Sequence, residues 1–559
     1  MLRIKPSDGG NLCLPERKDL LPGIRNLLSQ GRPVAISGLD GLGKTTLAHV
    51  YARQFAKRYK QVFKLNGATW VTLLADCIAL GNELGFPIQQ EQNFALTIQW
   101  IQDWLQMRRD YLLILDNIED QVLMKEVLPR RMAGHILLIA QSPITMIPCT
   151  NIALDELEQE NGALLVLPQT ELRLPLNMPE QVGEGQHSAA SALACELGGF
   201  PLALSQAGGY IKQTGCQISD YIQMYRSYDT QAVDAAQLSD AHAEALTITV
   251  GLSLAWLARE QPVAVLLLHT CAFLSPHVIP TALFTQAEEE VSETLQGLLL
   301  PALALQAMLE MLQELGLLTC QPETRSFTLA SQIQRVLREA LSEQEYDLAA
   351  QRALQVLDRP FLWAGSAWQR LQMSIHVQQV SVLHKIAHCI CEEEARLLGE
   401  AARVLWEHQC YREAGRMLQR ALVICEGVEG ARQPMLADLL ERLAAVLEKQ
   451  GDYAQAQQRL QRAVLLRLSQ GVYQKEIVVS LNNLGSLYLE QGKVEEAEEC
   501  YRKALWIGGQ LLGSADPLIA GLQADLGMLY LQEENYAEAE AYFVRALETW
   551  EQVGGEKEG

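Results

Sequence analysis

What this chain has little of excludes several kinds of protein. Its 45 Lys and Arg residues stand against 67 Asp and Glu, which gives a net charge of −22. Nucleic acids and anionic membranes bind to basic faces, so neither is expected as the main partner. The most apolar run, 297–309, is shorter than the roughly 18 residues of a bilayer span and contains Pro301 and Gln306. A membrane-spanning protein is therefore not expected.

The cysteines lack the spacing of a disulfide framework. None of the 12 forms a C-x-x-C pair, and their scatter suits reduced thiols in a cytoplasmic protein. Residues 1–10 have no apolar core, so no signal peptide is expected. No motif of the chain is accompanied by a Ser/His/Asp or Cys/His signature, which argues against nucleophilic catalysis.

What is present begins with a phosphate-binding motif. The stretch 38–46, GLDGLGKTT, fits the loop pattern G-x-x-x-x-G-K-[ST]. The apolar run 33–37 before it predicts a buried strand, and 45–59 after it contains no Gly or Pro and predicts a helix. Glycines let backbone N–H groups surround a phosphate, and the helix N-terminus adds its positive dipole end. The predicted nucleotide-binding residues are Gly38, Gly41, Leu42, Gly43, Lys44, Thr45 and Thr46.

The polar side chains of this motif have distinct expected roles. Lys44 is expected to reach the β- and γ-phosphates of ADP or ATP, Thr45 to hold Mg²⁺, and Thr46 to contact the α-phosphate. A second apolar run, 111–116, ends in Asp116 at the carboxyl end of its predicted strand, where open α/β sheets bind ligands. Asp116 is therefore the expected acid for the water shell of Mg²⁺ and the candidate catalytic residue.

Strands and helices alternate over the first 155 residues. Further strands are predicted at 61–65, 135–140 and 151–154, and further helices at 14–30, 70–84 and 93–108. This alternation predicts a doubly wound parallel sheet with helices on both faces.

Beyond residue 155 the pattern becomes helical. The stretch 188–210 predicts two helices separated by Gly-Gly-Phe-Pro, and 262–284 predicts apolar helix broken by Pro276 and Pro280. Two short strands, 318–320 and 326–329, flank a polar turn, and a helix at 331–341 follows them. Helices followed by a hairpin and another helix suggest a winged helix.

The last third of the chain repeats with a period of 41 or 42 residues. Small residues recur at Ala402, Ala444, Gly485 and Gly527. Larger side chains recur at Leu418, Leu460, Tyr501 and Phe543. The small residues let the two helices of a repeat approach closely, and the larger ones are expected to fill the gap to the next repeat. This is the tetratricopeptide pattern with a longer linker, similar to kinesin light chains. Such solenoids usually offer a concave groove to a peptide or protein, although a simple helical spacer is the alternative.

Together these segments resemble the NB-ARC family of STAND switch ATPases, in the bacterial form that carries tetratricopeptide repeats. The resemblance covers nearly the whole chain. It rests on the segments GLDGLGKTTLA (38–48), LLILDN (112–117), GGFPLAL (198–204), CAFLSPHVIP (271–280) and FTLASQIQRVLREAL (327–341), together with the repeats.

The resemblance implies a switch protein of several domains. A length of 559 residues is too great for a single core and by itself predicts three to five domains. The implied domains are a P-loop nucleotide-binding domain at 1–155, a helical ARC-like domain at 156–235, a winged-helix domain at 236–345, a helical linker at 346–394 and the repeats at 395–553. Pro201 inherits the family's contact with adenine and ribose. The family holds ADP in a closed monomer, then takes up ATP and oligomerises when its repeats sense a signal.

The sequence departs from the family pattern at three places. The strand that often precedes a γ-phosphate-reading Arg here runs into Ala140-Gln141-Ser142, and Asn117 follows Asp116 where a second Asp is common. Ala330 stands where a histidine usually contacts the β-phosphate of ADP. The first two departures imply at most a slow ATPase, and the third implies a weaker hold on ADP.

Other interpretations remain beside this one. A scaffold with permanently bound ADP and repeats that dock proteins is the main rival. A DNA-reading winged helix is rejected because 262–341 has three basic and eight acidic residues. His384, His388 and Cys391 share a helical face, but a single helix rarely supplies a whole zinc site and the spacing also fits a buried stripe. No effector domain fits ahead of residue 14, so the effector is expected to be a separate protein.

Overall fold

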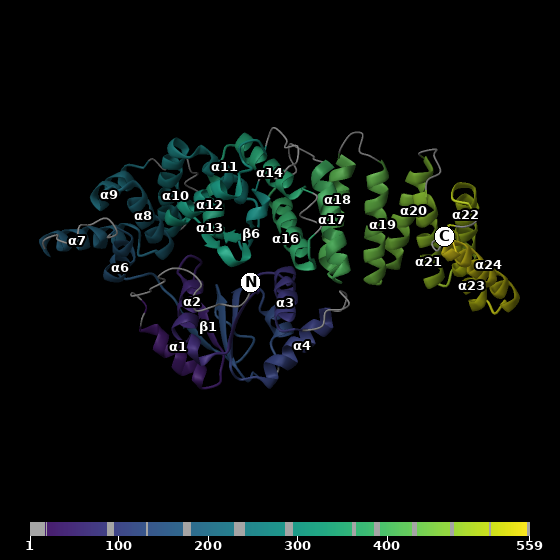
Figure 1. The fold of residues 1–559 in the computed structure, drawn as a ribbon, viewed down its shortest axis with the longest axis horizontal. Helices are drawn as coiled ribbons and strands as arrows, with labels where there is room; N and C mark the ends of the chain where they lie inside the picture. Colours follow the sequence, from purple (N-terminus) through teal and green to yellow (C-terminus); the bar gives the residue numbers. More distant parts are fainter. Residues whose placement is uncertain are drawn as a thin grey trace. The chain divides into compact units, whose positions relative to one another are not determined.

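The computed structural model describes most of the chain, in two compact units, Met1–His384 and Lys385–Gly559 (Figure 1). The described residues are 17, 19–85, 94–129, 132–170, 180–228, 241–285, 295–359, 365–384, 392–427, 433–469, 475–513 and 516–555. Across these ranges, no helix has the length and apolar character needed to cross a membrane. The two units are considered one at a time below.

The first unit begins with a five-stranded sheet in the order β2-β3-β4-β1-β5, in which every pairing is parallel. The strands are β1 Val34–Ser37, β2 Gln61–Asn66, β3 Tyr111–Ile118, β4 His135–Ala140 and β5 Thr150–Ala153. These strands confirm the parallel sheet predicted from the apolar runs. Strand β1 lies between β4 and β5, so the loop that follows it opens at the carboxyl edge of the sheet.

Helices cover both faces of this sheet (Figure 1). On one face, α1 Leu20–Ser29 and α2 Lys44–Gln54 pack on strand residues such as Ile36 and Ile114. On the other face, α3 Trp70–Glu83, α4 Phe94–Met107 and α5 Gln121–Val127 pack on the alternate strand residues, such as Phe63 and Leu113. The three inner strands β1, β3 and β4 therefore bury both of their faces, which explains the apolar runs of their sequences.

The helix predicted over 45–59 is shorter than expected. Helix α2 ends at Gln54, and a 3-10 turn, Ala56–Arg58, follows it. The turn lets the Tyr59 hydroxyl lie 3.0 Å from the Tyr51 hydroxyl and 2.7 Å from Nδ1 of His135 on β4. Because these contacts come from a distant strand, the helical pattern of the local sequence could not predict where the helix ends.

Four helices follow the sheet: α6 Gln159–Thr170, α7 Glu180–Glu196, α8 Pro201–Thr214 and α9 Ile218–Ser227. The predicted break between α7 and α8 is present. Gly198 and Gly199 have φ angles of 60° and 65°, and a Cβ on Gly199 would lie 2.0 Å from the carbonyl oxygen of Leu157. Glycine is therefore required at this turn, which sets Phe200 as the N-cap of α8 and Pro201 in its first turn.

The rest of the first unit contains a small antiparallel sheet in the order β6-β8-β7. The elements are α10 Ala241–Glu260, α11 Pro262–Cys271, β6 Ile279–Pro280, α12 Ala302–Glu314, β7 Thr319–Gln321, β8 Ser326–Thr328 and α13 Ser331–Glu339. Helices α14 Glu343–Leu357 and α16 Ala367–Leu383 complete the unit. The expected hairpin corresponds to β7 and β8, and the helix expected after it corresponds to α13.

The helical prediction over 262–284 is wrong in its second half. Helix α11 ends at Cys271, and the chain then forms β6, in which Ile279 pairs with Phe327 of β8. Pro276 and Pro280 have no backbone N–H group, which disfavours a continued helix and suits a short edge strand.

The second unit is a solenoid of four helix pairs. The pairs are α17 Glu392–Glu407 with α18 Tyr411–Gly427, α19 Gln433–Lys449 with α20 Tyr453–Ser469, α21 Lys475–Glu490 with α22 Val494–Leu511, and α23 Pro517–Gln532 with α24 Tyr536–Gly555. A Cβ on Gly485 would lie 2.7 Å from the Tyr501 ring, and one on Gly527 would lie 2.8 Å from the Phe543 ring. Each ring thus lies over the glycine of its own repeat, whereas the sequence placed it toward the next repeat.

Candidate nucleotide-binding site

The predicted phosphate loop connects the end of β1 to the start of α2, with Gly43 as the helix N-cap in the left-handed conformation. Gly38 and Gly41 have φ angles of 143° and 84°. A Cβ on Gly38 would lie 2.6 Å from the Leu154 carbonyl oxygen, and one on Gly41 would lie 2.5 Å from the Phe200 ring. The backbone of the loop and its close neighbours therefore both require glycine at these positions.

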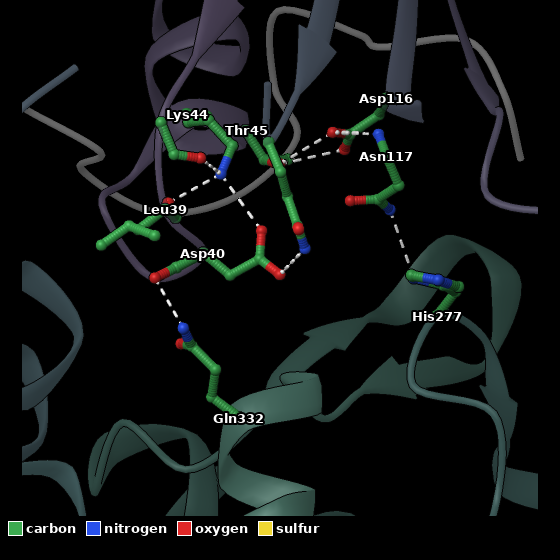
Figure 2. Close-up of polar contacts among 10 residues, drawn as sticks. Leu39, Asp40, Lys44, Thr45, Asp116, Asn117, His277 and Gln332 are labelled. Atoms are coloured by element: carbon green, nitrogen blue, oxygen red, sulfur yellow. Dashed lines mark hydrogen bonds and ion pairs between the residues drawn. The ribbon is translucent and has the colours of Figure 1, made fainter. Parts of the chain in front are cut away.

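Lys44 turns back over this loop (Figure 2). Its ammonium donates to the carbonyl oxygens of Gly38 and Leu39, at 2.7 Å each, and lies 3.1 Å from Oδ1 of Asp40. The side chain is almost fully buried, so the ammonium is held close to the backbone of the loop. Leu42 is buried as well, and Thr46 is half-buried in the first turn of α2.

Thr45 and Asp116 meet at the carboxyl edge of the sheet. The Thr45 hydroxyl lies 3.0 Å from each carboxylate oxygen of Asp116, and Nζ of Lys64 on β2 lies 2.8 Å from Oδ2 of the same carboxylate. Burial by itself raises the pKa of Asp116, but the Lys64 ammonium, with smaller contributions from His49 and Thr45, outweighs it and holds the pKa below its ordinary value. Asp116 is therefore an ionised carboxylate, the state required of a Mg²⁺ ligand.

Lys64 was not among the residues predicted for the site. It interrupts the apolar residues of β2, where a lysine whose stem is largely buried usually has an anionic partner. That placement is the signal that sequence reasoning could have used. The strand register sets Asn66 of β2 opposite Asp116 of β3, so Lys64 lies two residues before the acid's level in the sheet.

A histidine of the second half of the unit approaches Asp116 from the loop between α11 and β6. Asn117, which follows Asp116, has a φ of 56°, and its side-chain amide lies 3.3 Å from Nδ1 of His277 (Figure 2). Burial lowers the pKa of His277 to about 4, against the opposing effect of the Asp116 charge. The imidazole is therefore neutral near pH 7, and its Nδ1 accepts a hydrogen bond from the Asn117 amide.

The loop that carries His277 is braced from behind by α16. Nδ1 of His376 accepts a hydrogen bond from the backbone N–H of Ser275 at 3.0 Å, and the ring is fully buried. Burial lowers the pKa of His376 to about 4 as well. The last helix of the first unit is thus joined to a loop that reaches the predicted nucleotide site.

Helix α13 contacts the phosphate loop directly. Gln332 donates its side-chain amide to the carbonyl oxygen of Asp40 at 2.6 Å (Figure 2). Ala330, which stands where the family's histidine was expected, is the N-cap of this helix and offers no polar side chain. The contact with the loop is therefore made two residues later, by an amide that the sequence did not single out.

The end of β4, where the resemblance leads one to expect an arginine, also contacts Asp40. The side-chain amide of Gln141, just beyond β4, donates to Oδ2 of Asp40 at 2.6 Å, and its backbone carbonyl accepts from the N–H of Gly38 at 3.1 Å. Pro201 stands in the first turn of α8. Its neighbour Phe200 lies against Gly41, and the Phe200 ring is tilted against the His242 ring of α10, with ring centroids 5.0 Å apart.

The described residues give no support to a zinc site at His384, His388 and Cys391. His384 is the C-cap of α16, and residues 385–391, which include His388 and Cys391, lie outside the described residues. Within the described ranges, no group of three His, Cys, Asp or Glu side chains could hold a metal ion.

Fold and site together define a multidomain protein in which a parallel sheet with a glycine-rich loop precedes an array of helix pairs. Comparison with known proteins agrees for the array: the tetratricopeptide repeat family model matches residues 393–469 and 476–552. The C-terminal region therefore consists of tetratricopeptide repeats. No NB-ARC family model matches the chain.

The relatives that match are themselves named as tetratricopeptide repeat proteins. Mitochondrial tetratricopeptide repeat protein 19 is 32% identical over 108 residues, which are 19% of this chain and 29% of the rat (Rattus norvegicus) protein or 28% of the human (Homo sapiens) one. The chain thus spans less than a third of the length of these relatives. Among solved structures, a STAND protein with a tetratricopeptide repeat sensor from Pyrococcus horikoshii is matched over 97% of this chain and 84% of that one, at 14% identity and a TM-score of 0.42. BtubC from P. vanneervenii covers 37% of this chain and 82% of its own, at 18% identity and a TM-score of 0.27.

Proposed function

We propose that this protein is a nucleotide-dependent signalling switch of the NB-ARC type. Residues 1–155 bind ADP or ATP with Mg²⁺, the helical and winged-helix segments up to residue 345 gate the site, and the repeats bind a protein or peptide partner. The carrying observation is that Lys44, Thr45 and Asp116 converge on one glycine-rich loop, and that Gln332 contacts this same loop.

The chemistry of the loop supports the nucleotide. A phosphate is bound by backbone N–H groups and a cation. This loop has glycines with positive φ angles beside the Lys44 ammonium. Mg²⁺ prefers hard oxygen ligands, and the Thr45 hydroxyl and the Asp116 carboxylate form such a pair. Lys64 now neutralises Asp116, so a bound cation must share that carboxylate with it.

Contacts across the first unit support the gating role. Gln332 ties α13 to the backbone of Asp40, and His277 ties the loop before β6 to Asn117. The two contacts join Asp40 of the phosphate loop and Asn117 to segments more than 150 residues away in the chain. Whether the phosphates are present can therefore bias how tightly these segments hold the sheet domain.

The repeats supply the partner surface in this proposal. Tetratricopeptide repeats generally bind protein partners, and a partner bound there is the proposed signal for exchange of ADP for ATP and for assembly into a homo-oligomer. Hydrolysis is slow, because the fourth strand runs into Ala140-Gln141-Ser142, with no arginine to read the γ-phosphate.

The test starts from the full chain as purified. We expect denaturation followed by chromatography to release ADP, and calorimetry to show ADP binding that is lost in Lys44→Ala. Lys60→Ala is the matched control, because Lys60 pairs with Asp110 at an exposed position of the same domain. Equal ADP affinity in Lys44→Ala and in the parent chain would refute the nucleotide site.

The rival scaffold makes a different prediction for exchange. A scaffold with structurally bound ADP keeps it in the presence of excess ATP, whereas a switch exchanges it. Light scattering of the full chain with ATP, with and without a captured repeat partner, measures the assembly step. Retention of ADP for hours under excess ATP and partner favours the scaffold.

A further inference from the structure

The phosphate loop carries an acid, Asp40, at its third position, and its three oxygen atoms are all engaged. Oδ1 of Asp40 lies 3.1 Å from the Lys44 ammonium, and Oδ2 accepts from the Gln141 amide at 2.6 Å. The backbone carbonyl oxygen of Asp40 accepts from Gln332 at 2.6 Å. The carboxylate is thus held between Lys44 and Gln141 at the end of β4, while helix α13 holds the backbone of the same residue (Figure 2).

The Asp40 carboxylate pairs with Lys44, so it competes with the phosphates of a nucleotide for the ammonium. In a phosphate loop, the lysine neutralises the β- and γ-phosphates of the nucleotide. Here the same ammonium already has an anionic oxygen within 3.1 Å, supplied by the loop itself. A terminal phosphate that approaches Lys44 must therefore either displace Asp40 or share the ammonium with it.

The acidic residues around Asp40 make it unfavourable for a γ-phosphate to share the Lys44 ammonium with Asp40. Glu119 follows β3, and its pKa is raised by burial and further by the charge of Asp40, which places the two acids within electrostatic reach. Asp116 is ionised at the same edge of the sheet and is already neutralised by Lys64. Gln141, which faces Asp40, is an amide and brings no positive charge to the terminal phosphate.

We propose that Asp40 makes this site select a nucleoside diphosphate over a triphosphate. Its carboxylate pairs with the Lys44 ammonium at the place that a γ-phosphate would take, and it repels a γ-phosphate that enters the site. A diphosphate brings only its β-phosphate to the shared ammonium, so it meets less repulsion from Asp40 than a triphosphate does and binds while the contacts of Asp40 with Gln141 and Gln332 persist. The inference rests on the proposed nucleotide function and names the residue that sets its preference.

The matched variants are Asp40→Asn, which keeps the shape of the side chain but removes its charge, and Asp103→Asn, an exposed control on α4. Calorimetry on the full chain, with Mg²⁺ present, gives the affinities for ADP and for an ATP analogue with an imido bridge. We expect the ratio of ATP-analogue to ADP affinity to rise at least tenfold in Asp40→Asn, which corresponds to about 1.4 kcal/mol. It stays at the parent value in Asp103→Asn. The rise should be larger in low salt, because screening weakens the repulsion.

A second variant guards against a folding defect at the loop. Gln141→Ala releases one oxygen of the carboxylate without altering the loop, and we expect a smaller shift of the ratio in the same direction. An unchanged ratio in both variants, with ADP binding intact, overturns the role of Asp40 alone. A ratio that falls overturns it too, because it assigns Asp40 to holding the cation of the triphosphate. Absence of binding of either nucleotide to the parent chain and to Asp40→Asn overturns the nucleotide function itself.

Discussion

The Thr45 hydroxyl lies 3.0 Å from both carboxylate oxygens of Asp116, although the two residues are 71 positions apart in the chain. The parallel sheet makes this contact: β3 ends at the same edge where the loop after β1 begins. Lys64 completes the arrangement from β2, so three neighbouring segments contribute one group each. The Thr45 hydroxyl, the Asp116 carboxylate and the Lys64 ammonium thus form a small site at one edge of the sheet. A bound cation would compete with Lys64 for the Asp116 carboxylate.

Lys64→Met should therefore make the fold depend on Mg²⁺. Removing one partner of a fully buried ion pair costs about 3–5 kcal/mol, and because Lys64 is partly exposed we expect about 1–2 kcal/mol here. Thermal unfolding in EDTA should show the loss, and Mg²⁺ with ADP should restore most of it by neutralising Asp116. Lys60→Met, at an exposed position nearby, should show neither effect. Equal loss in both variants with no response to Mg²⁺ contradicts a cation at Asp116.

The repeats offer a test in which one methyl group has opposite effects at two positions. Gly485→Ala places a Cβ 2.7 Å from the Tyr501 ring, and we expect a net destabilisation of about 1–2 kcal/mol from overpacking. Gly521→Ala, in helix α23, meets no atom within 4 Å, and we expect a gain of up to about 1 kcal/mol from helix propensity. Chemical denaturation followed by circular dichroism measures both. A loss of similar size in the two variants would show that Tyr501 does not set the helix spacing.

The sequence predicted those parts of the molecule that depend on local pattern. The apolar runs at 111–116 and 135–140, the loop at 38–46 and the period of the repeats each lie within one stretch of chain, and the structure contains the strands, the loop and the helix pairs. The contacts of Lys64, His277 and Gln332 could not be predicted in the same way. Each depends on the packing of elements far apart in sequence, and no local pattern fixes which polar side chain faces which.

The end of α2 illustrates the same limit within a single element. The residues 45–59 have helical character throughout, yet the helix stops at Gln54 because Tyr59 contacts His135 on β4. The apolar stretch after Cys271 differs, because Pro276 and Pro280 disfavour a continued helix locally and Ile279 then pairs with Phe327 of β8. At the end of α2, by contrast, a tertiary contact overrides a local preference of a few tenths of a kcal/mol per residue.

Acid should weaken the first unit through its buried histidines. The pKa of His376 is lowered by burial to about 4 from an ordinary value of 6.5, so the unfolded chain takes up the proton more readily than the folded one. The contribution of the neutral His376 ring to the free energy of unfolding is fully present above about pH 6.5 and is lost as the pH falls toward 4. The loss should reach on the order of 3 kcal/mol for this group.

Urea denaturation at several pH values measures that loss. His376→Gln should flatten the dependence between about pH 6.5 and 4, because the amide can still accept from the Ser275 N–H group but does not titrate. His187→Gln, at an exposed position of α7, is the control and should retain the parental slope. A slope that survives in His376→Gln assigns the acid sensitivity to other groups.

Helix α13 should slow the release of ADP through its contact with the phosphate loop. Gln332 holds the Asp40 carbonyl at 2.6 Å, and its side-chain oxygen lies so close to Gly41 that a Cβ there would be 2.7 Å away. One neutral hydrogen bond contributes about 0.5–1.5 kcal/mol, so Gln332→Ala should speed release of a fluorescent ADP roughly two- to tenfold in stopped-flow. Arg335→Ala is the control on the same helix, because Arg335 is exposed and pairs only within α13 in the contacts described, with Glu339 at 3.6 Å. If both variants release ADP at the parental rate, α13 rests on the loop without gating it, and the scaffold becomes the better account of the chain.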